Sequence, residues 1–140
     1  MAASRRASKP KPALERRLAR AVASVLAWEG ARDATVELSL LDAPAMRRLN
    51  RRATGRRGLT DVIAYSLPQP GGRLVGDVFI CPAAAAAWAT GPEELTRLAV
   101  HGTLHVLGYD HPEGRGRMRS AMWRRQERYV ARLINGRRRA

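Results

Sequence analysis

All three histidines of this chain lie within one eleven-residue stretch, HGTLHVLGYDH, at positions 101, 105 and 111. On a helix, residues four apart lie on one face with Cβ atoms about 5–6 Å apart, so His101 and His105 can direct their rings at one point. Gly108 suits the left-handed residue that ends a helix and lets His111 return toward the same point. The stretch therefore predicts a helix that stops at Gly108 and a site closed by three imidazoles.

This histidine cluster predicts a metal centre. Three neutral imidazoles around an open position are a common ligand set of catalytic zinc, which lowers the pKa of its bound water from 15.7 to about 7. Structural zinc sites are usually closed by four ligands that often include cysteine, and the single cysteine, Cys81, lies in a separate predicted strand. The alternative is three surface or core histidines that bind no metal. The occurrence of all three within eleven residues, at ligand spacing, makes that alternative weak. One Zn²⁺ per chain is therefore expected on His101, His105 and His111.

A large basic excess predicts a polyanionic partner. The chain has 26 Lys and Arg residues and 12 Asp and Glu residues, which gives a net charge of +14. Such a charge on a small domain favours RNA, DNA or an anionic surface. The alternative is a composition bias from a GC-rich genome. Such a bias explains the excess of arginine over lysine better than it explains the excess of basic over acidic residues. No apolar run reaches the ~18 residues of a membrane helix, and one cysteine suits a reducing compartment such as the cytoplasm.

The length of 140 residues predicts one domain with basic ends. Residues 1–12 are polar and basic with two prolines, which predicts a disordered tail. Residues 13–135 form the predicted domain, and residues 136–140 a second basic tail.

The hydrophobic pattern predicts helices that alternate with strands. Helices are expected at 13–29, 42–52, 82–89, 90–108 and 114–134, and strands at 35–41, 60–67 and 73–81, with the last two strands paired as a hairpin. Asp42 is a predicted N-cap, and Thr90 with Glu93 has the spacing of a capping box. Met118 and Met122 are expected on the core face of the last helix.

The histidine stretch matches every fixed position of H-G-x-L-H-x-x-G-Y-D-H, the signature of the YbeY family of metal-dependent endoribonucleases. TDVIAYS, at 60–66, resembles the family's T-D-V-L-S-F, and LVGDVFI, at 74–80, resembles its L-x-G-D-I. The resemblance covers about residues 14–134. It implies an α/β fold with α+β character: one small mixed sheet of about four strands, surrounded by helices, with a metal cleft beside the sheet.

The resemblance also implies an activity, which charge and spacing alone do not identify. It implies a hydrolase that cleaves single-stranded RNA, processes the 3′ end of 16S rRNA in ribosome quality control and works on the small ribosomal subunit. The expected attacking group is zinc-bound water. Asp110 is a candidate proton acceptor or orienter of a ligand imidazole, and its alternative role is to cap the turn before His111.

One loop departs from the family pattern N-x-x-Y-R-G-x-D-x-P-T-D-V, whose arginine the resemblance implies to be catalytic. Ungapped counting from Asn50 puts Thr54 at the arginine position. Arginines nearby could bind the phosphate in a fork and stabilise the charge of the transition state; the candidates are Arg52, Arg56 and Arg57. Arg56 is preferred as the catalytic group. Gly55 and Gly58 flank the pair Arg56 and Arg57, and their flexibility can let the pair fold toward the cleft. The alternative for each arginine is a solvated side chain.

Two other functions fit part of the sequence. A non-catalytic RNA-binding factor of ribosome assembly, in which zinc holds the fold, is left open by the missing loop arginine. The spacing H-x-x-x-H-x-x-G-x-x-H also occurs in metzincin proteases, which carry a general-base glutamate directly after the first histidine. That position is Gly102, which cannot transfer a proton, so the protease is the weaker alternative.

Overall fold

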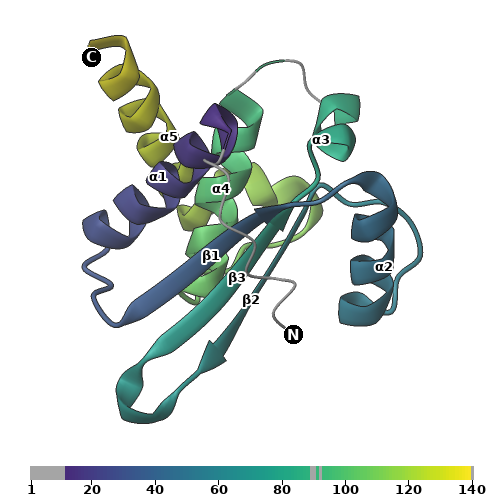
Figure 1. Cartoon of the computed structure of the whole chain (residues 1–140). Helices are drawn as coiled ribbons and strands as arrows, with labels where there is room; N and C mark the ends of the chain where they lie inside the picture. Colours follow the sequence, from purple (N-terminus) through teal and green to yellow (C-terminus); the bar gives the residue numbers. More distant parts are fainter. Residues whose placement is uncertain (1–11, 89–90, 92, 140) are drawn as a thin grey trace.

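The chain folds as helices and strands in an irregular alternation (Figure 1), and the computed structural model describes residues 12–88, 91 and 93–139. Nearly all of the predicted tail 1–12 therefore lies outside the described residues. The elements are α1 (Ala13–Trp28), β1 (Ala34–Leu40), α2 (Ala43–Thr54), β2 (Val62–Pro68), the short 3₁₀ helix η2 (Pro70–Gly72), β3 (Leu74–Ile80), α3 (Pro82–Trp88), α4 (Glu93–Val106), the 3₁₀ segment η3 (Gly114–Arg119) and α5 (Ala121–Arg139).

The described strands form one mixed sheet in the order β1-β3-β2. β2 and β3 are antiparallel and joined through η2, which confirms the predicted hairpin, and β1 pairs with β3 in parallel. The expected count of about four strands is wrong, because the described residues contain three. Residues 74–80 form one central strand that is paired along its whole length on both sides, so 73–81 does not divide into two strands.

Helices α1 and α4 cover one face of the sheet. Side chains alternate between faces along a strand, and the residues on this face are apolar. They form one cluster with residues of both helices: Leu18 and Val22 of α1, Val36, Leu38 and Leu40 of β1, Val78 and Ile80 of β3, and Leu98 and Ala99 of α4. Burying a side chain of this size stabilises a fold by about 1.5–3 kcal/mol. The cluster therefore fixes the orientation of α4, the helix that carries His101 and His105.

Two glycines let α4 approach β3 closely. A Cβ atom at Gly76 would lie 2.3 Å from Val106 Cγ1, and one at Gly102 would lie 2.6 Å from Val78 Cγ1. Packed interiors do not accommodate such overlaps without rearrangement. Position 102 therefore has no room for the glutamate of a metzincin protease, which weighs against that alternative.

Helix α2 packs on the opposite face of the sheet. A separate buried cluster lies there, formed by Met46, Ile63, Cys81 and Ala84. Figure 1 shows α2 to the right of the strands and α1, α4 and α5 to the left. Cys81 is fully buried, as expected for an inert core thiol. Among the described residues, the helices are all too short or too polar to cross a membrane.

Local signals mark several helix ends correctly. The Asp42 side chain accepts a hydrogen bond of 2.9 Å from the Ala45 N–H and caps α2. Gly108 has a φ of +101° and follows α4, as predicted. Thr90 lies outside the described residues, and α4 begins at Glu93.

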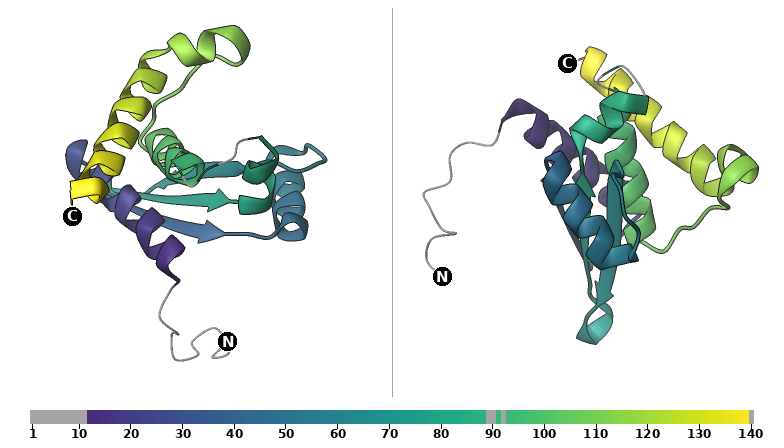
Figure 2. Two further views of the ribbon diagram at one scale, coloured as in Figure 1. Left: turned by 90° about the horizontal axis from the view of Figure 1, so that it is seen from above. Right: turned by 90° about the vertical axis from the view of Figure 1, so that its right-hand side faces the viewer.

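The last predicted helix is divided and extended. Ser120 separates η3 from α5, and its Oγ atom accepts a hydrogen bond of 3.1 Å from the Trp123 N–H, as an N-cap does. Because η3 is not continuous with α5, Met118 does not share the core face of Met122 and is 66% exposed. α5 continues to Arg139, so residues 136–139, predicted as a basic tail, are helical. Figure 2, left, shows η3 and α5 as an arc around α4.

Candidate metal centre

The three histidines meet at the C-terminal end of α4. His101 and His105 lie one turn apart on the helix, and the chain returns after Gly108 to bring His111 beside them. One nitrogen atom from each ring lies within 4.8 Å of the other two. The ring centroids are 4.5, 4.9 and 5.0 Å apart. The predicted grouping of the histidines is confirmed.

Each histidine uses its Nδ1 atom in a hydrogen bond and leaves Nε2 free. The partners are Gln126 Oε1 at 2.7 Å for His101, the Tyr109 carbonyl at 3.0 Å for His105 and the Pro112 carbonyl at 3.0 Å for His111. All three partners are acceptors, so each Nδ1 carries a proton, and Nε2 is the ring atom that remains available to a metal ion. Such outer hydrogen bonds orient histidine ligands in metal sites. The residues therefore fit a divalent metal ion.

A chain of hydrogen bonds connects His101 to an ion pair. Gln126 is 1% exposed, and its Nε2 atom donates to Glu127 Oε2 at 3.0 Å. The Glu127 carboxylate also accepts from Arg97 Nε at 2.8 Å and Nη2 at 3.0 Å. Because an ionised carboxylate only accepts, Glu127 fixes the Gln126 amide with its oxygen toward His101. Sequence reasoning missed Gln126, whose one signal was a polar residue on the apolar face of the last helix.

Replacing Gln126 tests this positioning role. We expect Gln126→Ala to weaken zinc binding about 10–100-fold, because His101 loses the acceptor that orients it. Competition with a chromophoric chelator measures the affinity. Gln69→Ala, at the hairpin turn, is the matched control and should bind zinc as the wild type does. Equal affinities for Gln126→Ala and wild type would show that this hydrogen bond does not position the ligand.

The loop that carries His111 is anchored to two helices. The Tyr109 hydroxyl donates to Glu29 Oε1 at 2.6 Å, and Arg125 Nη1 donates to Glu29 Oε2 at 2.9 Å. The Tyr129 hydroxyl donates to the same carboxylate. Burial raises the pKa of Glu29, but the hydrogen bonds from Tyr109, Tyr129 and Arg125 outweigh it and leave the pKa below its ordinary value. The ionised Glu29 thus ties the loop to α1 and α5.

Burial keeps two of the candidate ligands neutral. It lowers the pKa of His101 to about 4, although the hydrogen bond to Gln126 opposes the shift. The pKa of His105 is also lowered, first by burial and then by the charge of His111. Metal binding requires deprotonated imidazoles, so both rings are in the binding form at neutral pH.

These shifts predict how the metal-free protein responds to acid. His101 has a pKa of about 4 in the folded chain and 6.5 ordinarily, so the unfolded chain binds the proton first. The free energy of unfolding is therefore at its full value above pH 6.5. Between pH 6.5 and pH 4 it should fall by on the order of 3 kcal/mol because of His101. Urea unfolding at a series of pH values measures it. His101→Gln should show a shallower decrease, and an identical pH profile for both proteins would contradict this assignment.

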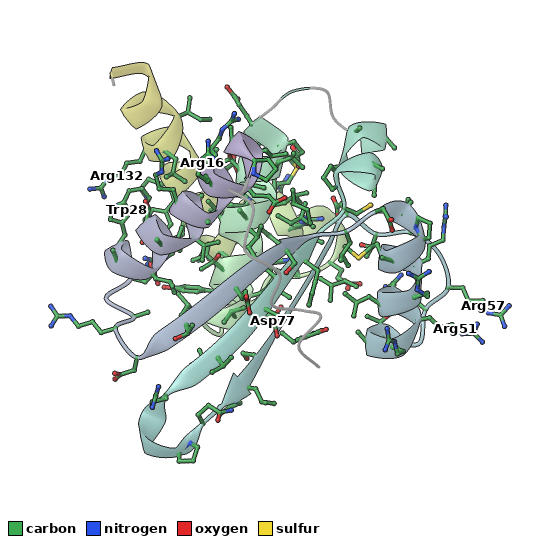
Figure 3. The ribbon with its side chains drawn as sticks, viewed as in Figure 1. Arg16, Trp28, Arg51, Arg57, Asp77 and Arg132 are labelled. Carbon is green, nitrogen blue, oxygen red and sulfur yellow. The ribbon has the colours of Figure 1, made fainter. Side chains whose placement is uncertain are left out.

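A cleft of about 720 Å³ extends from the histidines toward α2 and the β2 edge of the sheet. His101 and His105 line its inner end, and Arg56 and Arg57 line it from the loop after α2. Arg52 is exposed on α2 and is not among the residues that line the cleft. Figure 3 shows Arg57 extending outward from this side of the molecule. Two of the three predicted arginines thus share a cleft with His101 and His105.

Thr54, at the position of the family's arginine, has a local structural role. Its hydroxyl lies 2.7 Å from the Asn50 carbonyl oxygen and 2.8 Å from Asn50 Oδ1. It also accepts a hydrogen bond of 3.1 Å from the Arg56 N–H. Asn50, 7% exposed, donates its Nδ2 to the Gly58 carbonyl at 3.2 Å. Thr54 and Asn50 together hold the turn that carries Arg56.

The other predicted residue, Asp110, lies in the turn between the ligands. Its Oδ1 atom accepts a hydrogen bond of 2.8 Å from the His111 N–H. Asp110 lines neither this cleft nor the cavity described next. The contact is the turn cap that was its alternative role, and a part in proton transfer stays a prediction.

A second cavity of about 480 Å³ adjoins the cleft, and the two share Leu59, Thr60 and His101. Arg117 of η3 lines this cavity with Trp123, and its guanidinium carbon lies 5.9 Å from the centre of the Trp123 ring. The charge of Arg117 contributes to the lowered pKa of His101. Sequence reasoning missed Arg117, because GRGRMR contains three arginines that no local pattern distinguishes.

Comparison with known proteins places this fold and site in a family. The model of the family described as Endoribonuclease YbeY matches residues 3–134. The protein named Endoribonuclease YbeY of Mycolicibacterium gilvum is 38% identical over 96 residues, which cover 57% of this chain and 54% of the relative. That of Mycobacterium tuberculosis is 38% identical over 97 residues, with the same coverage of 57% and 54%. The matched part thus spans about half the length of the curated relatives.

A solved structure shares the fold. The solution structure of a Thermotoga maritima protein has a TM-score of 0.59 and 24% identity, and the alignment covers 94% of this chain and 89% of that chain. The family match covers nearly the whole sequence and includes the loop and all three histidines. The chain therefore belongs to the YbeY endoribonuclease family.

Proposed function

We propose that this chain is a zinc-dependent endoribonuclease that cleaves single-stranded RNA by hydrolysis of a phosphodiester bond. The observation that carries the proposal is the cluster of three histidines with free Nε2 atoms, of which His101 and His105 line a cleft together with Arg56 and Arg57. Relatives with 38% identity are named endoribonucleases. A net charge of +14 suits a polyphosphate substrate.

The proposed metal ligands are the Nε2 atoms of His101, His105 and His111. A divalent ion held by three imidazoles lowers the pKa of a water molecule toward 7 and polarises a phosphoryl oxygen. Zinc is proposed because three histidines with an open position are a usual catalytic zinc site, although imidazole also suits nickel, cobalt and copper. The chain contributes three rings oriented by hydrogen bonds at Nδ1, of which burial keeps His101 and His105 neutral, and Gln126 orients the most buried of them.

Arginines are proposed to hold the phosphate. Arg56 is the first candidate, because a guanidinium in this cleft can grip two phosphate oxygens and stabilise the charge of the transition state. Arg117 is a second candidate from the adjoining cavity. Arg57 and Arg52 are proposed to contact the RNA strand farther from the metal. Asp110 is proposed to accept a proton or to orient His111 through the turn that it caps.

The biological setting is proposed from family membership. We place the activity at the 3′ end of 16S rRNA, on the small ribosomal subunit and in ribosome quality control. The proposed compartment is the cytoplasm, which a chain with one cysteine suits. The alternative is a non-catalytic RNA-binding factor of ribosome assembly.

RNA cleavage with and without a chelator separates these functions. Metal-loaded protein should cut a labelled single-stranded RNA, lose the activity with a chelator and regain it with zinc. His111→Ala is the control for a contaminating nuclease and should stay inactive after zinc is added. Binding of RNA with no cleavage by any metal-loaded preparation would support the assembly factor instead.

A further inference from the structure

A separate basic cavity of about 320 Å³ lies between α1 and α5. Residues of α1 line it at intervals of three and four, so one face of that helix forms a wall. Thr96 of α4 also lines it, and α5 supplies the opposite wall with Arg132. None of its lining residues lines either cavity at the histidines. The cavity is therefore distinct from the metal centre.

The cavity is strongly positive. Arg17 and Arg20 of α1 and Arg132 of α5 line it, and no acidic residue does. Among the ion pairs within the described part of the chain, none involves these three arginines. Arg20 and Arg132 are exposed and Arg17 is half-buried, so three cationic side chains at the rim of so small a space create a field that attracts an anion.

Arg132 is held in place before any ligand arrives. Its guanidinium carbon lies 4.3 Å from the centre of the Trp28 ring, in a cation–π contact. The Trp28 ring in turn lies 5.1 Å from that of Tyr129. Figure 3 shows Arg132 beside Trp28, where α5 passes α1. A guanidinium that already rests on a ring loses less freedom on binding than an unrestrained one, which favours affinity.

A buried hydroxyl in the same cavity has no partner. Thr96 is 4% exposed, and its Oγ1 atom makes no hydrogen bond. Buried polar groups are nearly always paired, so either a water molecule or a ligand in the cavity is the expected partner of this hydroxyl. Ser24 of α1 adds a second hydroxyl to the lining. The cavity thus offers hydroxyl donors and guanidinium groups together.

We propose that this cavity binds a phosphate ester, carried either by a free nucleotide or by an RNA backbone. Arginine forks and hydroxyl donors are the groups that bind phosphate oxygens in proteins. A volume of about 320 Å³ is near the lower limit for ligand sites, which suits one phosphate with its attached sugar. The site is independent of the proposed nuclease activity, since it shares no lining residue with the histidine cavities.

Thr96→Val gives the sharpest test, because it removes the hydroxyl and keeps the shape. In ligand-free protein it should raise the melting temperature, since the unpaired hydroxyl no longer has to be buried. In protein prepared without metal, Thr96→Val should also weaken the binding of AMP, measured by calorimetry, by about tenfold. A variant that is more stable yet binds less tightly cannot be explained by misfolding.

Arg132→Gln should weaken the same binding by at least about tenfold. Arg124→Gln is its matched control, because Arg124 is exposed on the same helix, two turns from Arg132, and lines neither this cavity nor the one beside it. Removing this more distant charge should change the affinity by less than about twofold, since exposed charges are screened by salt.

The source of the phosphate is distinguished with three probes: AMP, adenosine and a short single-stranded RNA. Saturable binding of AMP but not adenosine, reduced in Thr96→Val and Arg132→Gln, assigns a free nucleotide. No AMP binding, with RNA affinity reduced in both variants but not in Arg124→Gln, assigns the RNA backbone. If both variants match Arg124→Gln with every probe, the proposed site is wrong. RNA cleavage by the zinc-loaded variants reports separately on the nuclease proposal.

Discussion

Replacing any one of the three histidines with alanine should remove stable zinc binding. The wild type is expected to carry about one zinc per chain after gel filtration, as measured by plasma mass spectrometry. Each of His101→Ala, His105→Ala and His111→Ala should retain only a small fraction of this amount, because two imidazoles with no third protein ligand form an incomplete site. The expected loss is the largest metal effect of any single substitution in the chain.

The histidine variants differ in what else they disturb. His101 is 6% exposed, so His101→Ala also leaves a cavity and a buried Gln126 without its partner. His111 is only partly buried, so its replacement tests metal binding with little effect on the fold. Circular dichroism should show His111→Ala as folded, and Gln69→Ala should retain its zinc. Wild-type metal content in all three histidine variants would remove the site.

The arginine at the scissile phosphate should carry the second large effect. We expect Arg56→Ala to lower single-turnover cleavage at saturating protein by about two orders of magnitude, as loss of a transition-state charge partner does. Loss of a mere phosphate anchor should instead weaken binding and leave the chemical step nearly unchanged. Arg48→Ala removes an exposed charge from α2 outside the cleft and is the matched control.

The same assay on Arg117→Ala decides between the two arginines that approach the histidines. A hundredfold loss there, with Arg56→Ala nearly normal, would assign the transition-state role to η3 instead of the loop. Adding Thr54→Arg to Arg56→Ala should restore only part of the rate, because the Thr54 hydroxyl holds the turn. Arg52 and Arg57 complete the series. If each of these four arginines can be replaced without loss of cleavage, none of them has taken over the role of the family's loop arginine.

What could be predicted from the sequence depended on local signals. His101 and His105 are one helical turn apart, and Gly108 marks the end of the same helix, so their meeting follows from short-range geometry. The N-cap at Asp42 and the hairpin are likewise set by neighbouring residues. A family resemblance set the expected strand count, and the pairing of β3 along both edges corrected it.

The parts that could not be predicted depend on packing between distant segments. Gln126 is 25 residues from His101, and its contact exists only because α5 packs against α4. Arg117 lines a cavity together with His101, and it belongs to the 3₁₀ segment that Ser120 separates from α5. Thr96 looked like an ordinary helical residue, and only the arrangement of three helices leaves its hydroxyl buried without a partner. No pattern within one segment contains these relations.

The proposed nuclease depends on a catalytic metal held by the three histidines. The most direct measurement is diffraction from crystals grown with zinc, recorded on both sides of the zinc absorption edge. We expect one anomalous peak, bonded to the Nε2 atoms of His101, His105 and His111 at about 2.0–2.1 Å, with a fourth position not filled by protein. A peak at other residues, a fourth ligand from the chain, or no peak between the histidines with zinc present would contradict it.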